Sequence, residues 1–252
     1  MADAHVAALR SSVARLREVV SRLDDGAVTR RAYPAEWTIA DVLSHLGSGA
    51  VITQRRLEDA LSGLSTPEDF APGVWDEWNA KTPPAQRDDA LAADAALLAR
   101  VEAVTPEEAG AVTFAMGPMT LDFAGFVGMR LNEHALHVWD VEVVDDPAAT
   151  LPQQAAALVV DNLGLIARFT GRPTGDTATI TVATTAPRRV FTVALEPDAV
   201  TFGPGPDTGS ADLEVPAEAF ARLVYGRLDP EHTPPGVHGA ALDVLRRVFP
   251  GP

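Results

Sequence analysis

The sequence contains no cysteine among its 252 residues. This absence excludes disulfide bonds, a cysteine nucleophile, CxxC redox chemistry and iron–sulfur clusters. Any metal ion must therefore be bound by His, Asp or Glu, and any thiol used in catalysis must come from another molecule. Positive charge is also scarce: the sequence has 20 Lys and Arg residues and 35 Asp and Glu residues, which give a formal net charge of −15. Such a surface repels phosphate backbones, so we expect no nucleic-acid partner.

Long hydrophobic runs are missing as well. Nowhere do 18 apolar residues follow one another, and the first residues, MADAHVAALRSS, lack the apolar segment of a signal peptide. Hydrophobic residues make up 46% of the chain and charged residues 22%, which is the balance of a globular protein. We therefore expect a cytoplasmic protein with no membrane partner. The sequence does not indicate its oligomeric state.

Helical patterning dominates residues 1–145. Apolar residues recur every three or four positions over 5–24, and a capping box of Thr38 and Asp41 is expected to start a second helix that reaches Leu61. An alanine-rich third helix is predicted at 84–104, and a fourth, capped by Thr120, at 121–141. These segments predict an up-and-down four-helix bundle. Between them, 64–84 is interpreted as a partly ordered connection and 112–119 as a small hairpin with a Gly–Pro turn.

A different pattern follows the linker at 145–152. A helix is predicted at 153–170, and alternating apolar residues predict strands at 177–184 and 189–195, with shorter ones at 199–202 and 211–215. Helices at 216–225 and 239–249 complete the chain. Residues 152–252 are thus expected to form a small α+β domain with a mainly antiparallel sheet, which makes the fold class α+β with two domains.

Three side chains in the predicted bundle have the chemistry of metal ligands. Glu133 and His137 are four residues apart and so lie one turn apart on the same helix face, while His45 lies on the second helix. If the two faces meet, two imidazoles and one carboxylate form a three-ligand site with open positions, suited to zinc, nickel, iron or manganese. The alternatives are an ordinary surface contact, because Glu–His pairs at this spacing are common, or side chains with satisfied hydrogen bonds in the core.

Neighbouring residues on the fourth helix refine this hypothesis. His134 points about 100° away from Glu133 and is interpreted as a surface or supporting residue rather than a ligand. Asp140 is placed to orient the imidazole of His137 through its other ring nitrogen. Arg130 is placed to pair with Glu133, which would either remove that ligand or hold it in position.

Two separated motifs carry a family resemblance. Residues 37–46 read WTIADVLSHL and residues 130–140 read RLNEHALHVWD. In this order they resemble the mycothiol-dependent maleylpyruvate isomerase family, one of the DinB-like metal-binding four-helix bundles. Residues 216–229, PAEAFARLVYGRLD, are similar to the small sterol-carrier-like domain that such enzymes append.

The resemblance implies a site and a reaction. It implies that His45, Glu133 and His137 bind a divalent metal, with zinc the preferred candidate, and that mycothiol is the cosubstrate. It also implies a catalytic arginine in the second domain, for which Arg227 is the candidate and Arg222 the runner-up; the alternative for both is an exposed cation at a helix end. The expected partners are a low-molecular-weight thiol and a small-molecule electrophile.

The implied activity is thiol S-transfer or a maleylpyruvate-type cis–trans isomerisation. The net charge of −15 favours a neutral electrophile over a dianion. Two other functions stay open from the residues: a hydrolase that uses metal-activated water, and a non-enzymatic ligand-binding module whose bundle is a relic.

Overall fold

The chain folds into two compact units in this computed structural model, which describes residues 2–116 and 119–251. The first unit is Met1–Asp146 and the second is Pro147–Pro252. The first is a helical bundle and the second combines helices with a four-stranded sheet, so the predicted α+β class is confirmed.

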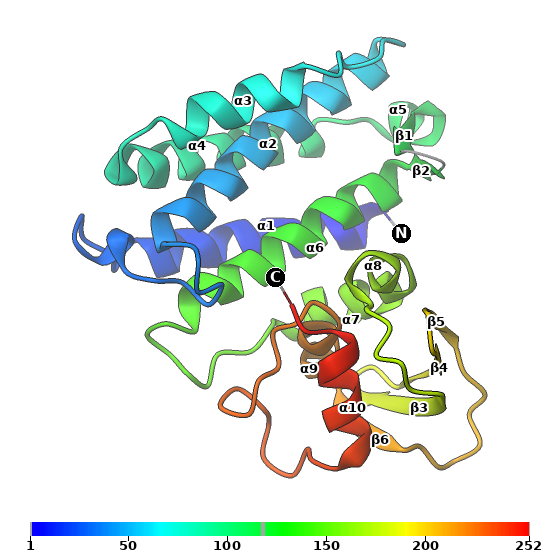
Figure 1. Ribbon diagram of the computed structural model, residues 1–252. Helices are drawn as coiled ribbons and strands as arrows, with labels where there is room; N and C mark the ends of the chain where they lie inside the picture. Colours follow the sequence, from blue (N-terminus) through cyan, green and yellow to red (C-terminus); the bar gives the residue numbers. More distant parts are fainter. Residues whose placement is uncertain (1, 117–118, 252) are drawn as a thin grey trace. The chain divides into compact units, whose positions relative to one another are not determined.

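Helices form most of the first unit (Figure 1). They are α1 (Ala2–Val20), α2 (Ile39–Leu61), α3 (Phe70–Asn79), α4 (Pro83–Glu102), α5 (Pro106–Ala111) and α6 (Phe123–Glu142), with the short 3-10 helix η1 (Ala27–Thr29) before α2. Helix α1 packs along α6, and α2 packs along α4. The predicted periodicity of the first helix is confirmed, because Leu9, Val13, Leu16 and Val20 are all buried.

The start of α2 is determined by its predicted capping box. The backbone N–H of Thr38 donates to the Asp41 carboxylate at 2.8 Å, and the N–H of Asp41 donates to the Thr38 hydroxyl at 3.1 Å. Such caps typically stabilise a helix by about 1 kcal/mol. Because the cap fixes where the helix begins, it also fixes the direction in which His45, two turns later, projects.

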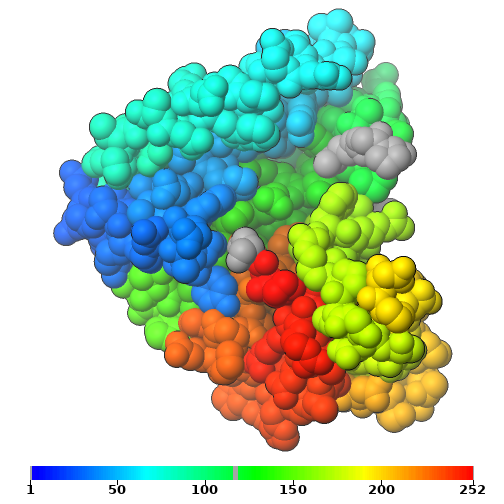
Figure 2. Space-filling model, viewed as in Figure 1, coloured from blue at the N-terminus to red at the C-terminus, as the bar shows by residue number. Residues whose placement is uncertain are grey.

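The segment predicted as a partly ordered connection contains helix α3, so that prediction is wrong. Pro72 lies in the first turn of the helix, where a missing N–H breaks no helical hydrogen bond. Trp78 is 4% exposed and packs against Gly47 of α2, where a Cβ atom would lie 2.1 Å from the indole ring. Tertiary packing of Trp78 therefore stabilises a helix that local composition disfavours. Figure 2 shows this segment, in cyan, at the surface of its unit.

A hairpin precedes α6, as predicted, but it is longer than expected. Strand β1 (Thr113–Met116) pairs with β2 (Met119–Asp122), and the predicted Gly–Pro turn at 117–118 lies outside the described residues. Leu121 belongs to β2, and Asp122 rather than Thr120 caps α6 by accepting a hydrogen bond from Gly125 N–H at 2.7 Å. The predicted start of this helix is therefore corrected by two residues.

The second unit is built on a sheet with strand order β5-β4-β3-β6. Its elements are α7 (Gln153–Asp161), α8 (Leu163–Thr170), β3 (Ala178–Thr185), β4 (Arg189–Glu196), β5 (Ala199–Pro204), β6 (Leu213–Pro216), α9 (Ala217–Val224) and α10 (Ala240–Val248). Strand β6 runs parallel to β3, and the other pairs are antiparallel. The helix predicted at 153–170 is two helices, because the chain leaves the regular helical path at Asn162.

Aromatic packing joins sheet and helix in this unit. The ring of Phe191 on β4 lies 5.3 Å from those of Phe202 on β5 and Phe220 on α9, measured between centroids. Phe191 and Phe220 are buried and belong to the core of this unit. Across the described residues, 2–116 and 119–251, no helix has the length and apolar character needed to cross a membrane.

Candidate metal centre

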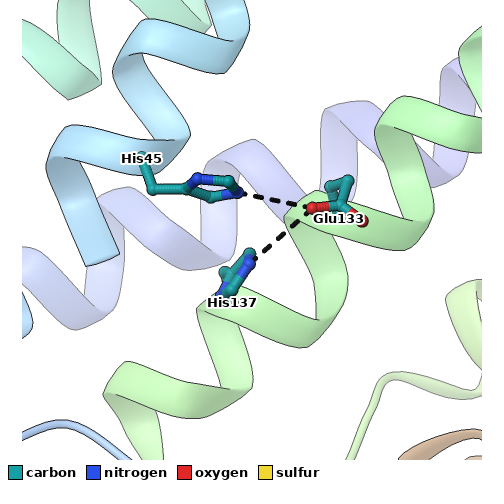
Figure 3. Close-up of side chains that lie close together, drawn as sticks. All are labelled: His45, Glu133 and His137. Atoms are coloured by element: carbon teal, nitrogen blue, oxygen red, sulfur yellow. Dashed lines mark hydrogen bonds and ion pairs between the residues drawn. The ribbon is translucent and has the colours of Figure 1, made fainter. Parts of the chain in front are cut away.

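Three possible metal ligands converge in the helical unit (Figure 3). His45 projects from α2, while Glu133 and His137 project from successive turns of α6. Nε2 of His45 lies 3.4 Å from Oε2 of Glu133, and Nε2 of His137 lies 3.7 Å from the same oxygen. One donor atom from each residue falls within 4.8 Å of the other two.

These separations suit a small divalent cation. Zinc binds histidine nitrogen and carboxylate oxygen at about 2.0–2.2 Å, so two ligands of a tetrahedral ion lie about 3.3–3.5 Å apart. The distances of 3.4 and 3.7 Å to Glu133 lie at or just above this value. Two imidazoles and a carboxylate also leave one or more positions free for another molecule.

The carboxylate of Glu133 is prepared to act as an anionic ligand. Burial would raise its pKa, but the hydrogen bond with His45 and the charges of His137, His45 and Arg130 outweigh this effect and lower the pKa to about 2. Glu133 is therefore ionised throughout the physiological range. Its side chain is 43% exposed and that of His45 38%, so the cluster is open to solvent on one side.

Asp140 holds the imidazole of His137 in place. Oδ2 of Asp140, which is 0% exposed, lies 2.8 Å from Nδ1 of His137. A hydrogen bond there places the ring proton on Nδ1 and leaves Nε2, the atom that faces Glu133, free to donate its lone pair. This is the orienting role that the sequence predicts for Asp140.

Trp37 covers one side of the cluster. Its ring stacks on that of His137 at 5.9 Å with an interplanar angle of 16°, and lies 5.3 Å from that of His45. A cavity of about 470 Å³ opens beside His45. It is lined by Glu36, Trp37, Asp41, His45, Trp75 and Asn79. The cavity thus combines two indoles with two carboxylates, next to the candidate ligands.

Two residues of α6 lie elsewhere than the sequence indicates. His134 is fully buried and its ring contacts Ser12 and Asp94, so the surface alternative is excluded and the interpretation as a supporting residue remains. Arg130 donates to Asp94 at 2.6 Å, and so leaves Glu133 available as a ligand. Its positive charge still helps to lower the pKa of Glu133. The predicted pair of Arg130 with Glu133 is therefore not formed, and Arg130 acts on Glu133 only through its charge.

The candidate arginines of the second unit are both buried, so neither is an exposed cation at a helix end. Arg222 is 2% exposed and donates to both carboxylate oxygens of Glu218 and to the carbonyl of His232. These contacts give Arg222 a structural role in the loop after α9. Arg227 is 6% exposed and donates to the carbonyl of Tyr225. Its catalytic role stays a prediction.

Sequence reasoning missed Asp94 and the polar wall of the cavity. Asp94 had a recognisable pattern, because it falls in line with Ala90, Leu97 and Val101 on the buried face of α4. A carboxylate on an apolar helical stripe indicates a buried partner. Asn79 lies on α3, and its place beside His45 depends on a helix that the sequence did not predict.

The fold and the ligand cluster define a class of protein: a helical bundle with a candidate metal centre, joined to a small α+β unit. Comparison with known families gives a match to the one described as "Mycothiol maleylpyruvate isomerase N-terminal domain" over residues 9–142, more than half of the chain. The chain belongs to the mycothiol maleylpyruvate isomerase family, and the expectation of an enzyme is confirmed at the level of that family.

Solved structures show the same fold. A crystal structure of the mycothiol-dependent maleylpyruvate isomerase is 14% identical, with a TM-score of 0.65, and the match covers 94% of this chain and 96% of that one. A mutant of that enzyme, in which a histidine is replaced by alanine, is also 14% identical, with a TM-score of 0.61 and 90% of each chain covered. A comparison by sequence with curated proteins found no match.

Proposed function

We propose that this chain is a metal-dependent enzyme in which His45, Glu133 and His137 bind a divalent cation, preferably zinc, that activates the low-molecular-weight thiol mycothiol. The thiol then attacks a small electrophile. The observation that carries the proposal is the convergence of three donor atoms within 4.8 Å in a chain that has no cysteine of its own. Membership of the mycothiol maleylpyruvate isomerase family supports mycothiol as the thiol.

The donor set fits the requirements of thiol activation. A free thiol has a pKa of about 8.5, so only a few per cent is thiolate at neutral pH. A divalent cation at this position would favour the thiolate form and so supply a nucleophile. One carboxylate and two neutral imidazoles offset only one of the cation's two charges, so an anionic sulfur is still attracted.

The residues around the ligands have distinct tasks in this reaction. Asp140 keeps Nε2 of His137 directed at the centre, and Trp37 excludes water from one side of both imidazoles. The thiolate adds to one carbon of an activated double bond, and the electron pair of that bond moves onto the electron-withdrawing group. Rotation about the resulting single bond and expulsion of the thiolate then give the trans isomer, with no net change in atoms or electrons.

Arg227 is proposed as the residue that binds a carboxylate of the electrophile. A guanidinium binds a carboxylate through two parallel hydrogen bonds, which would hold a dicarboxylate substrate in one orientation. Substituting Arg227 with Lys should therefore raise KM for a dicarboxylate more than for an uncharged electrophile. Equal effects on the two substrates would remove Arg227 from substrate binding.

The cavity beside His45 supports a second candidate reaction. Its wall carries the carboxylates of Glu36 and Asp41, which repel an approaching dianion. A neutral electrophile meets no such barrier and can stack on Trp37 or Trp75. In that case the thiolate would either displace a leaving group such as chloride or add to a double bond that then takes up a proton. The sulfur would stay attached to its target, and the enzyme would be a thiol S-transferase.

One assay separates these functions. The zinc-loaded protein is incubated with mycothiol and either maleylpyruvate or the neutral electrophile monochlorobimane, and the trans isomer or the fluorescent conjugate is measured. Omission of thiol, removal of zinc and the His45→Ala variant serve as controls, and each should abolish turnover. Hydrolysis of an ester or amide that proceeds equally well without thiol would instead support the metal-dependent hydrolase.

A further inference from the structure

A second polar cluster lies inside the helical unit, separate from the candidate ligands. Oγ of Ser12 lies 2.8 Å from Nδ1 of His134, whose Nε2 lies 3.0 Å from Asp94. Nη2 of Arg130 donates to the other oxygen of Asp94 at 2.6 Å and to the carbonyl of Leu46 at 2.9 Å. We refer to Ser12, Asp94, Arg130 and His134 as the buried polar chain.

The buried polar chain connects the four long helices of the unit. Ser12 belongs to α1, Asp94 to α4, and Arg130 and His134 to α6, while the accepting carbonyl belongs to α2. All four side chains are buried, with residue exposures between 0% and 6%. Because they are closed to solvent, this serine, histidine and aspartate do not form a hydrolytic triad, although they are hydrogen-bonded in a similar order.

Stability alone is a poor explanation for these residues. A buried ion pair has a desolvation penalty that can exceed its attraction, and apolar residues of similar volume are often as stable or more so. The Nε atom of Arg130 has no hydrogen-bond partner among the described residues, so its guanidinium is incompletely satisfied. Buried ionic groups are best attested as devices that fix the register of neighbouring helices.

The buried polar chain lies next to the candidate ligands in sequence and in space. Arg130 and His134 flank Glu133 on α6, and the carbonyl that accepts from Arg130 belongs to Leu46, the residue after His45. Gly49 of α2 leaves room for this guanidinium, since a Cβ atom there would lie 2.9 Å from Nη1. Arg130 of α6 thus contacts α2 directly beside the candidate ligand His45.

We propose that Asp94 and Arg130 are positioning residues of the metal centre, which set its affinity for a divalent cation by fixing α2 against α6. Arg130 bridges the two helices, and Asp94 holds its guanidinium from α4. The inference rests on the proposed function, because it assumes that His45, Glu133 and His137 bind the cation. It adds that the geometry of these ligands depends on residues that do not touch the ion.

The test uses Co²⁺, whose absorption spectrum reports the geometry of its ligands. The full-length double variant Asp94→Asn/Arg130→Met keeps an acceptor for His134 and fills the space of the guanidinium without burying a lone charge. We expect its dissociation constant for Co²⁺ to rise roughly 10- to 100-fold, the range found for residues that support metal ligands. We also expect altered visible bands, while the metal-free protein keeps its helical circular dichroism and unfolds cooperatively.

A matched control comes from a second buried carboxylate, that of Asp59 on α2. Asp59 accepts a hydrogen bond from Arg55 of the same helix at 2.8 Å, so this ion pair joins no two helices. Asp59→Asn should change the Co²⁺ dissociation constant less than twofold, with an unchanged spectrum. An effect in this control as large as that in the double variant would mean general loosening of the bundle and would overturn the inference.

The possible outcomes separate the inference from the function on which it rests. If the wild-type protein itself does not bind Co²⁺, both fail. If the wild type binds and the double variant matches it within twofold with the same spectrum, only the inference fails. Should the double variant not fold, Gly49→Ala serves instead, because its methyl group displaces the guanidinium; it must weaken Co²⁺ binding several-fold. Gly73→Ala, which has open space around its Cβ position, is the control and must leave Co²⁺ binding unchanged. Equal Co²⁺ binding by these two alanine variants refutes the inference.

Discussion

Substituting Asp140 perturbs the candidate metal centre without removing a proposed ligand. Its buried carboxylate lies 2.8 Å from Nδ1 of His137. Groups that orient a ligating histidine typically contribute 10- to 100-fold to metal affinity, equivalent to about 1.4–2.7 kcal/mol. Asn keeps an oxygen that can accept the hydrogen bond but has no charge, so Asp140→Asn should weaken binding about tenfold. Ala has no acceptor, so Asp140→Ala should weaken it about 100-fold.

The measurement is the zinc dissociation constant at neutral pH, obtained by competition with a coloured chelator well below the unfolding temperature. Glu142→Gln is the matched control, because this carboxylate belongs to the same helix but pairs with Arg15 in a partly exposed ion pair. It should alter zinc affinity less than twofold. If both Asp140 variants bind zinc as tightly as the control does, the orientation of His137 does not depend on Asp140 and the reasoning is refuted.

Three further predictions concern other parts of the helical unit. His45→Ala should abolish zinc binding but keep the helical circular dichroism, and retention of stoichiometric zinc would exclude His45 as a ligand. Burial would raise the pKa of Asp94, but the charges of His134 and Arg130 and their hydrogen bonds outweigh this and lower it. The ionised carboxylate therefore stabilises the fold fully above about pH 5, and this contribution is lost as pH falls through the lowered pKa. In a plot of the free energy of unfolding against pH, Asp94→Asn should show a smaller decrease on the acid side than the wild type does. Gly47→Ala places a methyl carbon 2.1 Å from the Trp78 ring, far inside the contact distance of two carbon atoms, and should destabilise the fold by about 1–3 kcal/mol in a denaturant titration. An unchanged midpoint would show that the ring can move aside.

The sequence predicts elements whose structure is determined locally. The capping box at Thr38 and the apolar period from Leu9 to Val20 are features of neighbouring residues, and both are present in the structure. The strands of the second unit follow alternating patterns in the same way. In each case side-chain chemistry within one or two turns is sufficient, so no knowledge of the tertiary fold is needed.

Elements that depend on distant partners could not be predicted in this way. Helix α3 contains Pro72 and Gly73, which disfavour a helix, and it is stabilised by burial of Trp78 against α2. The partner of Arg130 was equally inaccessible, because Asp94 is 36 residues away on another helix. For the ligand cluster, the sequence could predict the residue types and the spacing of Glu133 and His137. It could not predict that His45 lies beside them, because that depends on the tertiary packing of α2 and α6.

Helix α6 shows why those residue types were nevertheless informative. Arg130, Glu133, His134, His137 and Asp140 fall within about 120° of the helix circumference at 100° per residue. An amphipathic helix normally turns its apolar stripe to the core, yet four of these five residues are buried. Burying so many polar groups is costly unless each has a partner, and here the partners come from other helices or from the next turn. A polar stripe on an otherwise apolar helix therefore indicates a site, because burying polar side chains costs free energy unless each has a partner.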